Sequence, residues 1–571
     1  MEEHYENFMN DKQTLFLALP AVVYLLVFTL YPIASNFVLS FYERTYEGEL
    51  RWVGGGNYVW LFTKDPYGPL IVGNTVIYTL ATPAIAVALA IPTALALRRL
   101  GGKWLLPLMI PAFIPPVTAA MAWYLLLNPL YGLGYYLLAS GLVKTNPISS
   151  IWAIVLIDVW RAFPTAVLII YSGLRSIPKS IEEAALADGL AGPRKFLAVD
   201  LPLISPQILT AFVLTALTGF FTFDPIYIGT AQVGPRLLDN LAYYAFEVFA
   251  SGESGYAATL IVIMTLVGTA LSLAYMRALS SRTFVKLPLP AWVPRRELPR
   301  VVHAAVLAAA LVFVAVPFIW LVLISIKPPK EIIQVPPAIL PTRLAVDNYV
   351  QVFTGGAPFL LISLYISAIN TSLTILLAAA TAYQMRVHGF GGYKLVAYIL
   401  YLMSTPTLIY IVPLYFMLKE LRFLDTLWAL VLTYPIMTLP YSIWILYNYY
   451  SAFNRQVEEA ALADGMNRLK AFARVVLPLS RSGMSVAGLY AFLFSWGALI
   501  FPLAFTQTPY NLADPLSFRG AQTFSIYIGM LMSPVTLSYG QVAAAGVVSI
   551  IPPLVYLVAV RRNLEKIWGS G

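Results

Sequence analysis

The chain of 571 residues is 59% hydrophobic and only 11% charged, with a mean hydropathy of +0.76. A soluble domain carries about 25% charged residues, so this composition excludes a water-soluble globular protein and indicates a chain that crosses a bilayer. The sequence has no cysteine, which excludes disulfides, iron–sulfur clusters and thiol catalysis. Its three histidines, His4, His303 and His388, lie far apart and argue against a metal site built on imidazole.

Twelve stretches are apolar and long enough to cross a bilayer, for which about 20 residues are needed. Residues 1–12 are polar, and the apolar run after them is too long for a signal peptide, so no cleavable signal is predicted. The spans expected in the first half are 14–41, 72–97, 104–127, 150–172, 204–229 and 257–279. Those expected in the second half are 301–326, 359–384, 394–418, 426–449, 482–506 and 541–560. The predicted fold is an all-α membrane protein with about 12 transmembrane helices.

The distribution of Lys and Arg determines the expected orientation. If the N-terminus is cytoplasmic, 24 of the 36 basic residues lie in inside segments, 11 lie in outside loops and Arg161 lies within a span. Because basic residues concentrate in cytoplasmic loops, we expect a multi-pass protein of the plasma membrane with both termini in the cytoplasm. The net charge of +9 then follows from topology and indicates no nucleic-acid partner.

A basic stretch, 281–300, separates the two sets of spans, and its three prolines disfavour a continuous helix. We therefore expect a first domain over 1–285, a cytoplasmic linker over 286–300 and a second domain over 301–571. Because each domain has an even number of spans, both enter the membrane in the same orientation. They are predicted to be parallel repeats, which often enclose a pathway between them.

One octapeptide, EEAALADG, occurs in both halves, at 182–189 and at 458–465. Each copy is followed at the same distance by Leu-Pro-Leu, at 201–203 and 477–479. Both copies are polar islands in an apolar chain, and the expected orientation places both in the cytoplasm. The repeat indicates a tandem of two related halves, each with one surface for a partner.

Each copy predicts a helix, a glycine bend and a second short helix. Ser180 and Glu183 have capping-box spacing, so the first helix is expected to start there. Gly189 is expected to end it in the left-handed conformation. Pro193 suits the first turn of a helix over 193–200, and Leu201-Pro202 is expected to end that helix. In the second copy, the expected cap is Asn454 and the expected stop is Leu477-Pro478.

The two copies resemble the cytoplasmic signature of binding-protein-dependent ABC importer permeases: Glu-Ala-Ala, three residues, Gly, nine residues, an aliphatic residue, any residue and Leu-Pro. The matching positions are Glu183-Ala184-Ala185, Gly189, Val199 and Leu201-Pro202, then Glu459-Ala460-Ala461, Gly465, Val475 and Leu477-Pro478. In that family the first helix of the segment couples to an ATPase subunit. The resemblance implies coupling segments over 178–203 and 454–479. The implied coupling residues are Glu182, Glu183, Ala184, Ala185, Asp188 and Gly189, and Glu458, Glu459, Ala460, Ala461, Asp464 and Gly465.

The resemblance extends over nearly the whole chain and is sharpest for the sugar branch of the family, the maltose and glycerol-phosphate type. The first half carries Tyr31-Pro32, Gly56-Asn57-Tyr58, Asn74-Thr75 and Gly255-Tyr256-Ala257; the second carries Asp347-Asn348-Tyr349, Ser495-Trp496 and Phe501-Pro502-Leu503. The family usually encodes these halves as separate chains, and here they are fused. One departure follows Ser495-Trp496, where the family usually carries Asn-Glu and this chain has Gly497-Ala498.

No GxxxxGK[ST] phosphate loop occurs, since Gly102-Lys103 continues with Trp104. The chain itself is therefore expected to hold no cofactor and to be no enzyme. The resemblance implies two copies of a separate ATPase subunit that hold ATP and Mg, an extracytoplasmic solute-binding protein and a sugar substrate.

Polar residues inside predicted spans are candidates for a substrate pathway, because burying charge in a bilayer costs about 2.5–3.5 kcal/mol per residue on insertion scales. Asp158 and Arg161 are close enough on one helix to form a pair, which could line the pathway or be structural. Asp224 could line the entry or reach interfacial water. Asn74 and Asn370 could bind sugar hydroxyls or join helices. Tyr227 and Trp496 offer aromatic faces, although most aromatic residues pack between helices or sit at the interface.

Two hypotheses follow. The first is the fused transmembrane subunit of an ATP-driven sugar importer that works by alternating access. The second is a proton-coupled secondary carrier with twelve helices. Such carriers usually need carboxylates or histidines within their spans, of which this chain offers few, and they give the duplicated cytoplasmic motif no role.

Overall fold

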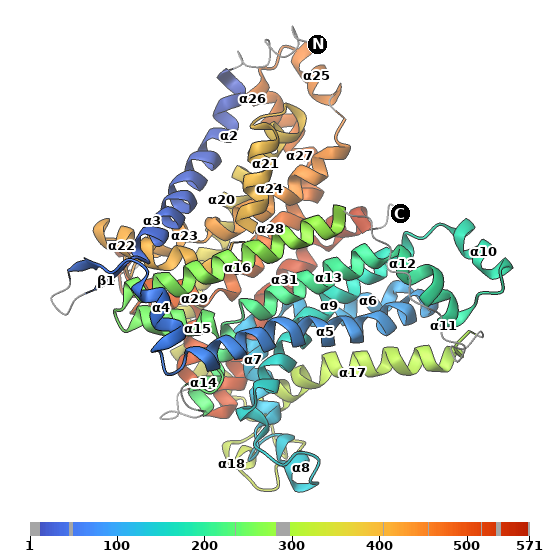
Figure 1. The fold of residues 1–571 in the computed structure, drawn as a ribbon, viewed down its shortest axis with the longest axis vertical. Coiled ribbons are helices and arrows are strands. Elements are labelled where there is room, and N and C mark those ends of the chain that lie inside the picture. Colours follow the sequence, from blue (N-terminus) through green and yellow to red (C-terminus); the bar gives the residue numbers. More distant parts are fainter. Residues whose placement is uncertain are drawn as a thin grey trace.

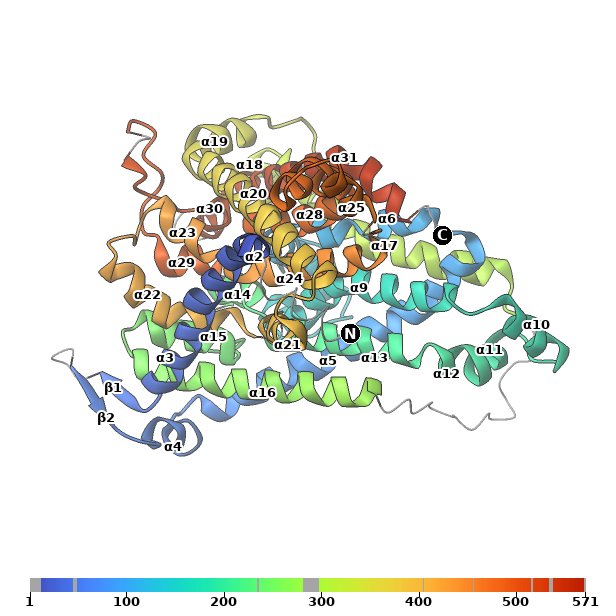
Figure 2. The same cartoon turned by 90° about the horizontal axis from the view of Figure 1, so that it is seen from above.

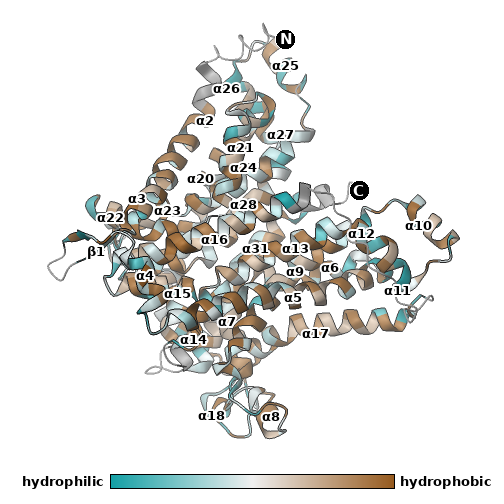
Figure 3. Ribbon diagram, in the orientation of Figure 1, coloured by the Kyte–Doolittle hydropathy of each residue, from teal (hydrophilic) through white to brown (hydrophobic). Residues whose placement is uncertain are grey.

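The computed structural model describes residues 12–44, 49–233, 236–280, 297–403, 405–454, 456–514, 517–532 and 538–568. Most of this is helical, and Figure 1 shows long helices that run through the body of the molecule. Figure 3 shows that the long helices α2, α5 and α17 are predominantly apolar. The predicted linker 286–300 lies outside the described residues except for 297–300, so the division into domains stays a prediction.

The first half contains these elements: α2 (Lys12–Leu25), α3 (Tyr31–Leu39), β1 (Tyr42–Arg44), β2 (Leu50–Trp52), α4 (Gly56–Thr63), α5 (Gly68–Leu100), α6 (Leu105–Leu108), α7 (Pro116–Leu127), α8 (Gly134–Ala139), α9 (Ile151–Arg175), α10 (Lys179–Ala187), α11 (Gly192–Lys195), α12 (Leu201–Leu203), α13 (Ser205–Phe220), α14 (Asp224–Val233), α15 (Leu241–Ala250) and α16 (Ser254–Ser280). The two short strands pair antiparallel, with Glu43 opposite Arg51.

The second half contains α17 (Arg300–Ser325), α18 (Pro329–Ile332), α19 (Asp347–Gly355), α20 (Ala357–Val387), α21 (Gly392–Met403), α22 (Ile411–Glu420), α23 (Leu427–Thr433), α24 (Pro435–Tyr449), α25 (Gln456–Ala463), α26 (Arg468–Ala471), α27 (Leu477–Leu479), α28 (Arg481–Gly497), α29 (Ile500–Phe505), α30 (Phe524–Leu531) and α31 (Tyr539–Trp568).

Nine helical stretches among the described residues are long and apolar enough to cross a membrane, and two bent pairs raise the number to eleven. The nine fall on nine of the predicted spans. The other three predicted spans are broken. The 104–127 stretch is divided between α6 and the short apolar helix α7. The 394–418 stretch bends by 100° between α21 and the helix after it, and α28 follows a 78° bend.

Prolines explain the breaks in the third span of each half. Pro115 lies directly before α7 and Pro116 is its first residue, and Pro406 lies at the bend before the turn that leads into α22. A proline cannot donate the helical hydrogen bond and pushes the residue before it out of the helical conformation. Beyond its break, α7 runs through the centre of the molecule, where every residue from Val117 to Leu126 is buried. Apolar length alone therefore overestimated the continuity of these spans.

Proline also explains three short π-helical turns, Leu26–Leu30, Phe196–Asp200 and Phe472–Val476. Each ends two residues before a proline: Pro32, Pro202 and Pro478. A proline ring clashes with the carbonyl four residues before it in an α-helix. Widening the preceding turn to the π form removes this clash without ending the helix.

The two halves share one core arrangement. Helices α5, α9 and α13 pack against one another in the first half, and α20, α24 and α28 do so in the second. The first span of each half packs on the opposite core, since α2 lies along α20 and α17 lies along α5 (Figure 1). The last spans, α16 and α31, lie on opposite flanks (Figure 2). The halves are therefore interlocked by a reciprocal exchange of their first spans.

Candidate functional site

The octapeptide copies lie in two segments, 178–203 and 454–479, which we call the first and second repeat segments. Figure 1 shows them far apart, with α10 at one extremity of the molecule and α25 at another. Each segment consists of a short helix, a glycine bend and a second short helix, as the sequence predicts. The bend is the same in both copies, because Gly189 has φ +72° and Gly465 has φ +83°.

The hydrogen bonds at each bend form the Schellman arrangement that left-handed glycines allow. The Gly189 N–H donates to Leu186 O at 3.0 Å, and Leu190 N–H donates to Ala185 O at 2.9 Å. In the second segment the equivalent distances are 3.0 Å from Gly465 N to Leu462 O and 3.1 Å from Met466 N to Ala461 O. The glycine stop is therefore confirmed in both copies.

The predicted starts of the two helices have different outcomes. The capping box at Ser180 and Glu183 is wrong, because α10 begins at Lys179 after an extended Pro178 and has no side-chain cap. Proline already fixes the conformation in which the helix starts. The Asn454 cap is confirmed, since its Oδ1 accepts from Gln456 N–H at 3.0 Å.

The predicted ends of the second short helices are also corrected. The helix was expected to end at Leu201-Pro202, and at Leu477-Pro478 in the second copy. It runs instead through α12 to Leu203 and through α27 to Leu479, because the π turns accommodate both prolines.

The two octapeptides expose equivalent residues on their outward faces. Glu183 and Glu459 are exposed, as are Ala184 and Ala460 and the Asp-Gly pairs at 188–189 and 464–465. Ala185 and Ala461 face inward, with only 4% and 5% of their surface exposed. Small side chains flanked by carboxylates form the outward surface of each segment.

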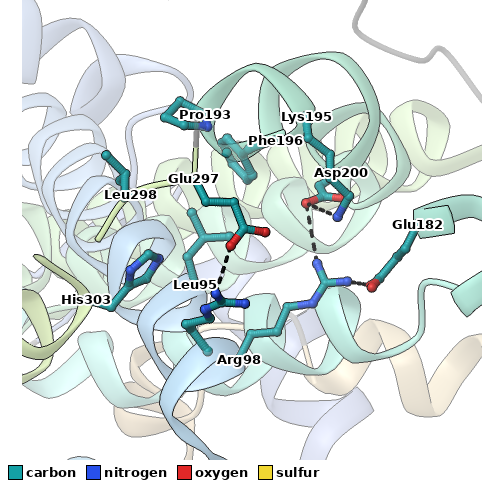
Figure 4. A pocket seen from close by; sticks show the side chains of 12 residues that line it. Leu95, Arg98, Glu182, Pro193, Lys195, Phe196, Asp200, Glu297, Leu298 and His303 are labelled. Atoms are coloured by element: carbon teal, nitrogen blue, oxygen red, sulfur yellow. Dashed lines mark hydrogen bonds and ion pairs between the residues drawn. The ribbon is translucent and has the colours of Figure 1, made fainter. Parts of the chain in front are cut away.

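The first glutamate of each octapeptide faces inward and has charged or polar partners. Glu182 forms an ion pair with Arg98, which belongs to the last turn of α5. The Arg98 guanidinium also lies 3.4 Å from Asp200 Oδ2, and Lys195 Nζ lies 3.3 Å from Asp200 Oδ1. Figure 4 shows Arg98 between the two carboxylates, at the wall of a cavity of about 390 Å³. We call this cluster the first clamp.

The second clamp has the same position and different chemistry. Glu458 is 2% exposed and accepts a hydrogen bond of 2.5 Å from Tyr383 Oη, near the end of α20. His388 Nε2 lies 3.2 Å from the same carboxylate, and Arg468 Nη1 lies 3.3 Å from His388 Nδ1. A guanidinium only donates, so His388 Nδ1 is the acceptor in this contact. Burial raises the pKa of Glu458, but the hydrogen bonds from His388 and Tyr383 outweigh burial and the pKa is lowered.

Three adjoining cavities of about 490, 290 and 270 Å³ lie between the halves. Arg161 lines all three, and Asp224 lines two of them. The proline breaks of both halves contribute to the walls. Gly497 and Ala498, where the family usually carries Asn-Glu, line the smallest of the three. The predicted pathway residues Arg161, Asp224 and Trp496 are thus brought together around one interior space.

Asp158 lies behind this space. It is fully buried, and its Oδ1 lies 3.2 Å from Arg161 Nη1, so the pair expected from their spacing forms. Arg161 retains 21% exposure of its side chain. The aspartate therefore holds the arginine at the cavity wall, where Arg161 is the only basic side chain that the described residues contribute to the three cavities.

Asn74, Asn370 and Tyr227 pack between helices, and Trp496 both packs and lines a cavity. Asn74 Nδ2 donates to Asp239 O at 2.9 Å and to Leu237 O at 3.2 Å. Asn370 Nδ2 donates to Ser495 Oγ at 2.6 Å. The Tyr227 ring stacks on Phe223, with centroids 6.3 Å apart, and is not among the side chains that line the three cavities. Trp496 lines the largest cavity with its ring, while its indole N–H donates to Ser549 O at 2.7 Å.

A second duplicated cluster is one that the sequence patterns do not predict. At the end of the spans opposite the repeat segments, Asn57 Nδ2 donates to Ser40 O at 3.0 Å and Tyr58 Oη lies 2.7 Å from Ser40 Oγ. In the second half Asn348 Nδ2 donates to Ser325 O at 2.9 Å, and Tyr349 Oη lies 2.8 Å from Ser325 Oγ. The two Asn-Tyr pairs were noted only as family-like motifs. Their shared geometry caps the end of the first span in each half.

These clusters offer no metal site: among the described ranges, no group of three or more His, Asp or Glu residues is placed to hold an ion.

Comparison with known proteins gives a family match in each half. The model of the binding-protein-dependent transport system inner membrane component matches residues 71–285 and again residues 373–566. Each repeat segment falls within one of the two matches.

Several curated relatives each match about half of the chain. The diacetylchitobiose uptake system permease protein NgcG of Streptomyces coelicolor is 31% identical and covers 44% of this chain and 82% of its own length. The trehalose/maltose transport system permease protein MalF of Thermococcus litoralis is 28% identical, covering 45% and 90%. The trehalose transport system permease protein SugB of Mycobacterium tuberculosis is 27% identical, covering 48% and 97%.

Among solved structures, a chain of a bacterial ABC transporter involved in the import of alginate matches with a TM-score of 0.42 and 17% identity. The match covers 49% of this chain and 99% of that one.

Proposed function

The chain belongs to the family of binding-protein-dependent transport system inner membrane components, and we propose that it is the fused permease of an ATP-driven sugar importer. In this proposal it receives its substrate from an extracytoplasmic binding protein and releases it into the cytoplasm by alternating access. The repeat segments and both termini face the cytoplasm, and the chain lies in the plasma membrane.

The observation that carries this proposal is the duplicated exposed surface of the repeat segments. Two identical octapeptides end in the same Schellman bend and present Glu183 and Glu459 outward from equivalent positions. Such surfaces suit two equivalent grooves on a pair of ATPase subunits, which supply ATP and Mg. Because the two outward faces are identical over eight residues, we propose that two copies of one ATPase dock there.

The three interior cavities support a sugar as the substrate. Their walls combine neutral hydroxyl groups with aromatic rings. Hydroxyls can donate and accept hydrogen bonds, as sugar hydroxyls do, and ring faces provide apolar contact area. The names of the relatives NgcG, MalF and SugB refer to diacetylchitobiose, trehalose or maltose. The wall residues in question are Thr165, Thr218, Thr405, Tyr441, Tyr490 and Trp496.

The exchange of first spans suggests how movement would spread. Closing an ATPase dimer would draw the two repeat segments together. Because α2 packs on α20 and α17 packs on α5, displacement of one core must also move a helix of the other half. The two halves would therefore rock as a coupled pair, with Arg161 and Asp224 at the interior wall and Asp158 behind Arg161 during the change of access.

The test is ATP hydrolysis in proteoliposomes that contain the chain, candidate ATPase subunits and binding proteins loaded from a sugar panel. We expect one loaded binding protein to stimulate hydrolysis and uptake. The double change Glu183→Lys and Glu459→Lys should abolish both. The matched control is Glu253→Lys, which alters an exposed glutamate at the opposite end of the spans and should leave hydrolysis intact. Uptake that follows a proton gradient and needs no ATP would instead support a secondary carrier.

A further inference from the structure

Adjacent glutamates of each octapeptide have different surroundings, and we propose that they have different tasks. Glu182 and Glu458 are positioning residues that transmit motion of the coupling helix to the second span of the same half. Glu183 and Glu459 make the outward contact with the ATPase. This inference rests on the proposed function, and it assigns the transmission step to the two clamps.

The helix geometry separates the two side chains. Successive residues of an α-helix are rotated by about 100°, so neighbouring glutamates point to different faces. In both segments the first glutamate turns toward the membrane-spanning core and the second is exposed. Glu182 keeps 34% of its side chain exposed and Glu458 keeps 3%. Neither can therefore present its whole carboxylate to a docked partner.

The first clamp joins three elements. Arg98 lies in the last turn of α5, Glu182 belongs to α10, and Asp200 ends the π turn of the second short helix (Figure 4). Helix α5 in turn packs on α9, α13 and the exchanged α17. A displacement of α10 thus reaches the core of the first half and the first span of the second half through one guanidinium.

The second clamp joins the equivalent three elements through unrelated side chains. Tyr383 and His388 lie at the end of α20, Glu458 belongs to α25, and Arg468 begins α26. Helix α20 packs on α24, α28 and the exchanged α2. The same connection is made by an ion pair in one half and by a tyrosine–carboxylate–imidazole chain in the other. The two clamps occupy the same position but use different side chains. This indicates that both halves require a link between the coupling helix and the second span, whichever residues form it.

The experiment compares Glu182→Gln with its neighbour Glu183→Gln, and Glu458→Gln with Glu459→Gln. Each pair changes one carboxylate to an amide within the same identical octapeptide. Loss of a hydrogen bond to a charged group costs enough free energy to change an equilibrium constant about tenfold. We expect Glu183→Gln and Glu459→Gln to weaken ATPase binding about tenfold. The clamp variants should bind the ATPase within about twofold of wild type and transport several-fold less sugar per ATP hydrolysed.

The chain alone provides a second readout, amide hydrogen exchange in lipid nanodiscs. Loss of a clamp should raise exchange about tenfold in α10 for Glu182→Gln and in α25 for Glu458→Gln, with no change in α10 for Glu183→Gln. Tyr383→Phe, which removes one hydrogen bond and no charge, should raise exchange in α25 to a smaller extent.

The possible failures are distinguishable. If no ATPase binds the wild-type chain, the proposed function fails, and the exchange measurement still decides whether the clamps hold the helices. If Glu182→Gln weakens ATPase binding as much as Glu183→Gln, or leaves both the exchange and the sugar transported per ATP unchanged, the division of tasks is refuted.

Discussion

The glycines at the two bends provide the sharpest test of the repeat segments. Gly189 and Gly465 have φ +72° and +83°, and a Cβ added at either position would meet no atom within 4 Å. Substitution therefore brings no clash, and its whole cost comes from the backbone. An L-residue in the left-handed conformation costs roughly 1–2 kcal/mol, which corresponds to a factor of about 5–30 in the population of the bend.

We expect the substitutions at Gly189 to rank by backbone preference. Asn enters the left-handed region most easily, Ala less so, and β-branched Val least. ATPase affinity and sugar uptake should be reduced least in Gly189→Asn, more in Gly189→Ala and most in Gly189→Val, while the amount of chain in the membrane stays constant. The matched control is Gly73→Ala, since Gly73 is helical and also has open space around its Cβ position. If Val behaved like Asn at Gly189, or if Gly73→Ala caused the same loss, the backbone argument would be wrong.

Three further predictions concern the outer packing, the second clamp and the cavity wall. A Cβ at Gly255 would overlap the backbone oxygen of Tyr42, whereas a Cβ at Gly540 would lie 2.6 Å from the side-chain amide of Asn348. Moving that amide would cost its hydrogen bond to Ser325 O but would leave the backbone in place. Gly255→Ala should therefore lower the melting temperature in detergent more than Gly540→Ala, and equal effects would contradict this. Because the pKa of Glu458 is lowered, the stability that this carboxylate contributes is present above the ordinary glutamate pKa of about 4.3 and is lost as the pH falls through the lowered value. Hydrogen exchange in α25 should therefore stay slow from neutral pH down to about pH 5. In Tyr383→Phe, the rise in the exchange rate of α25 should begin at a higher pH. Removing one partner of a buried ion pair costs about 3–5 kcal/mol, so Arg161→Met should destabilise the chain strongly and Asp158→Asn added to it should restore part of the loss, which thermal unfolding of both variants would show.

Local rules predicted much of the fold, because the residues that set a helix end lie within a few positions of it. Gly189, Gly465 and Asn454 behave as their residue types indicate. The same rules failed at Ser180, where the neighbouring Pro178 had already determined the start of the helix. Apolar length located nine spans, but it carries no information on how prolines such as Pro116 and Pro406 break a stretch of high hydropathy.

The candidate site was less accessible from sequence, because its contacts join distant residues. The repeat identified the octapeptides, yet nothing in their spacing pointed to Arg98 or Tyr383, the latter 75 residues before its partner Glu458. Asn74 and Asn370 show the converse, since amides within spans suit both sugar and helix contacts, and only the fold reveals their partners. The Arg161–Asp158 pair was predictable because its two residues are separated by a single helical turn.

The exchanged first spans lead to a last prediction, on the fusion itself. Relatives such as NgcG and SugB cover less than half of this chain while most of their own length is matched, so a single half is a complete chain in those proteins. We expect residues 1–285 and 286–571, expressed together as two chains, to assemble and to support uptake. Each expressed alone should be unstable, because α2 and α17 then lose the cores on which they pack. The linker would act mainly by raising the effective concentration of one half near the other to about the millimolar range, so the split pair should need higher expression to reach the same uptake. A half that is stable and monodisperse by itself would show that the exchange of first spans is dispensable for the fold.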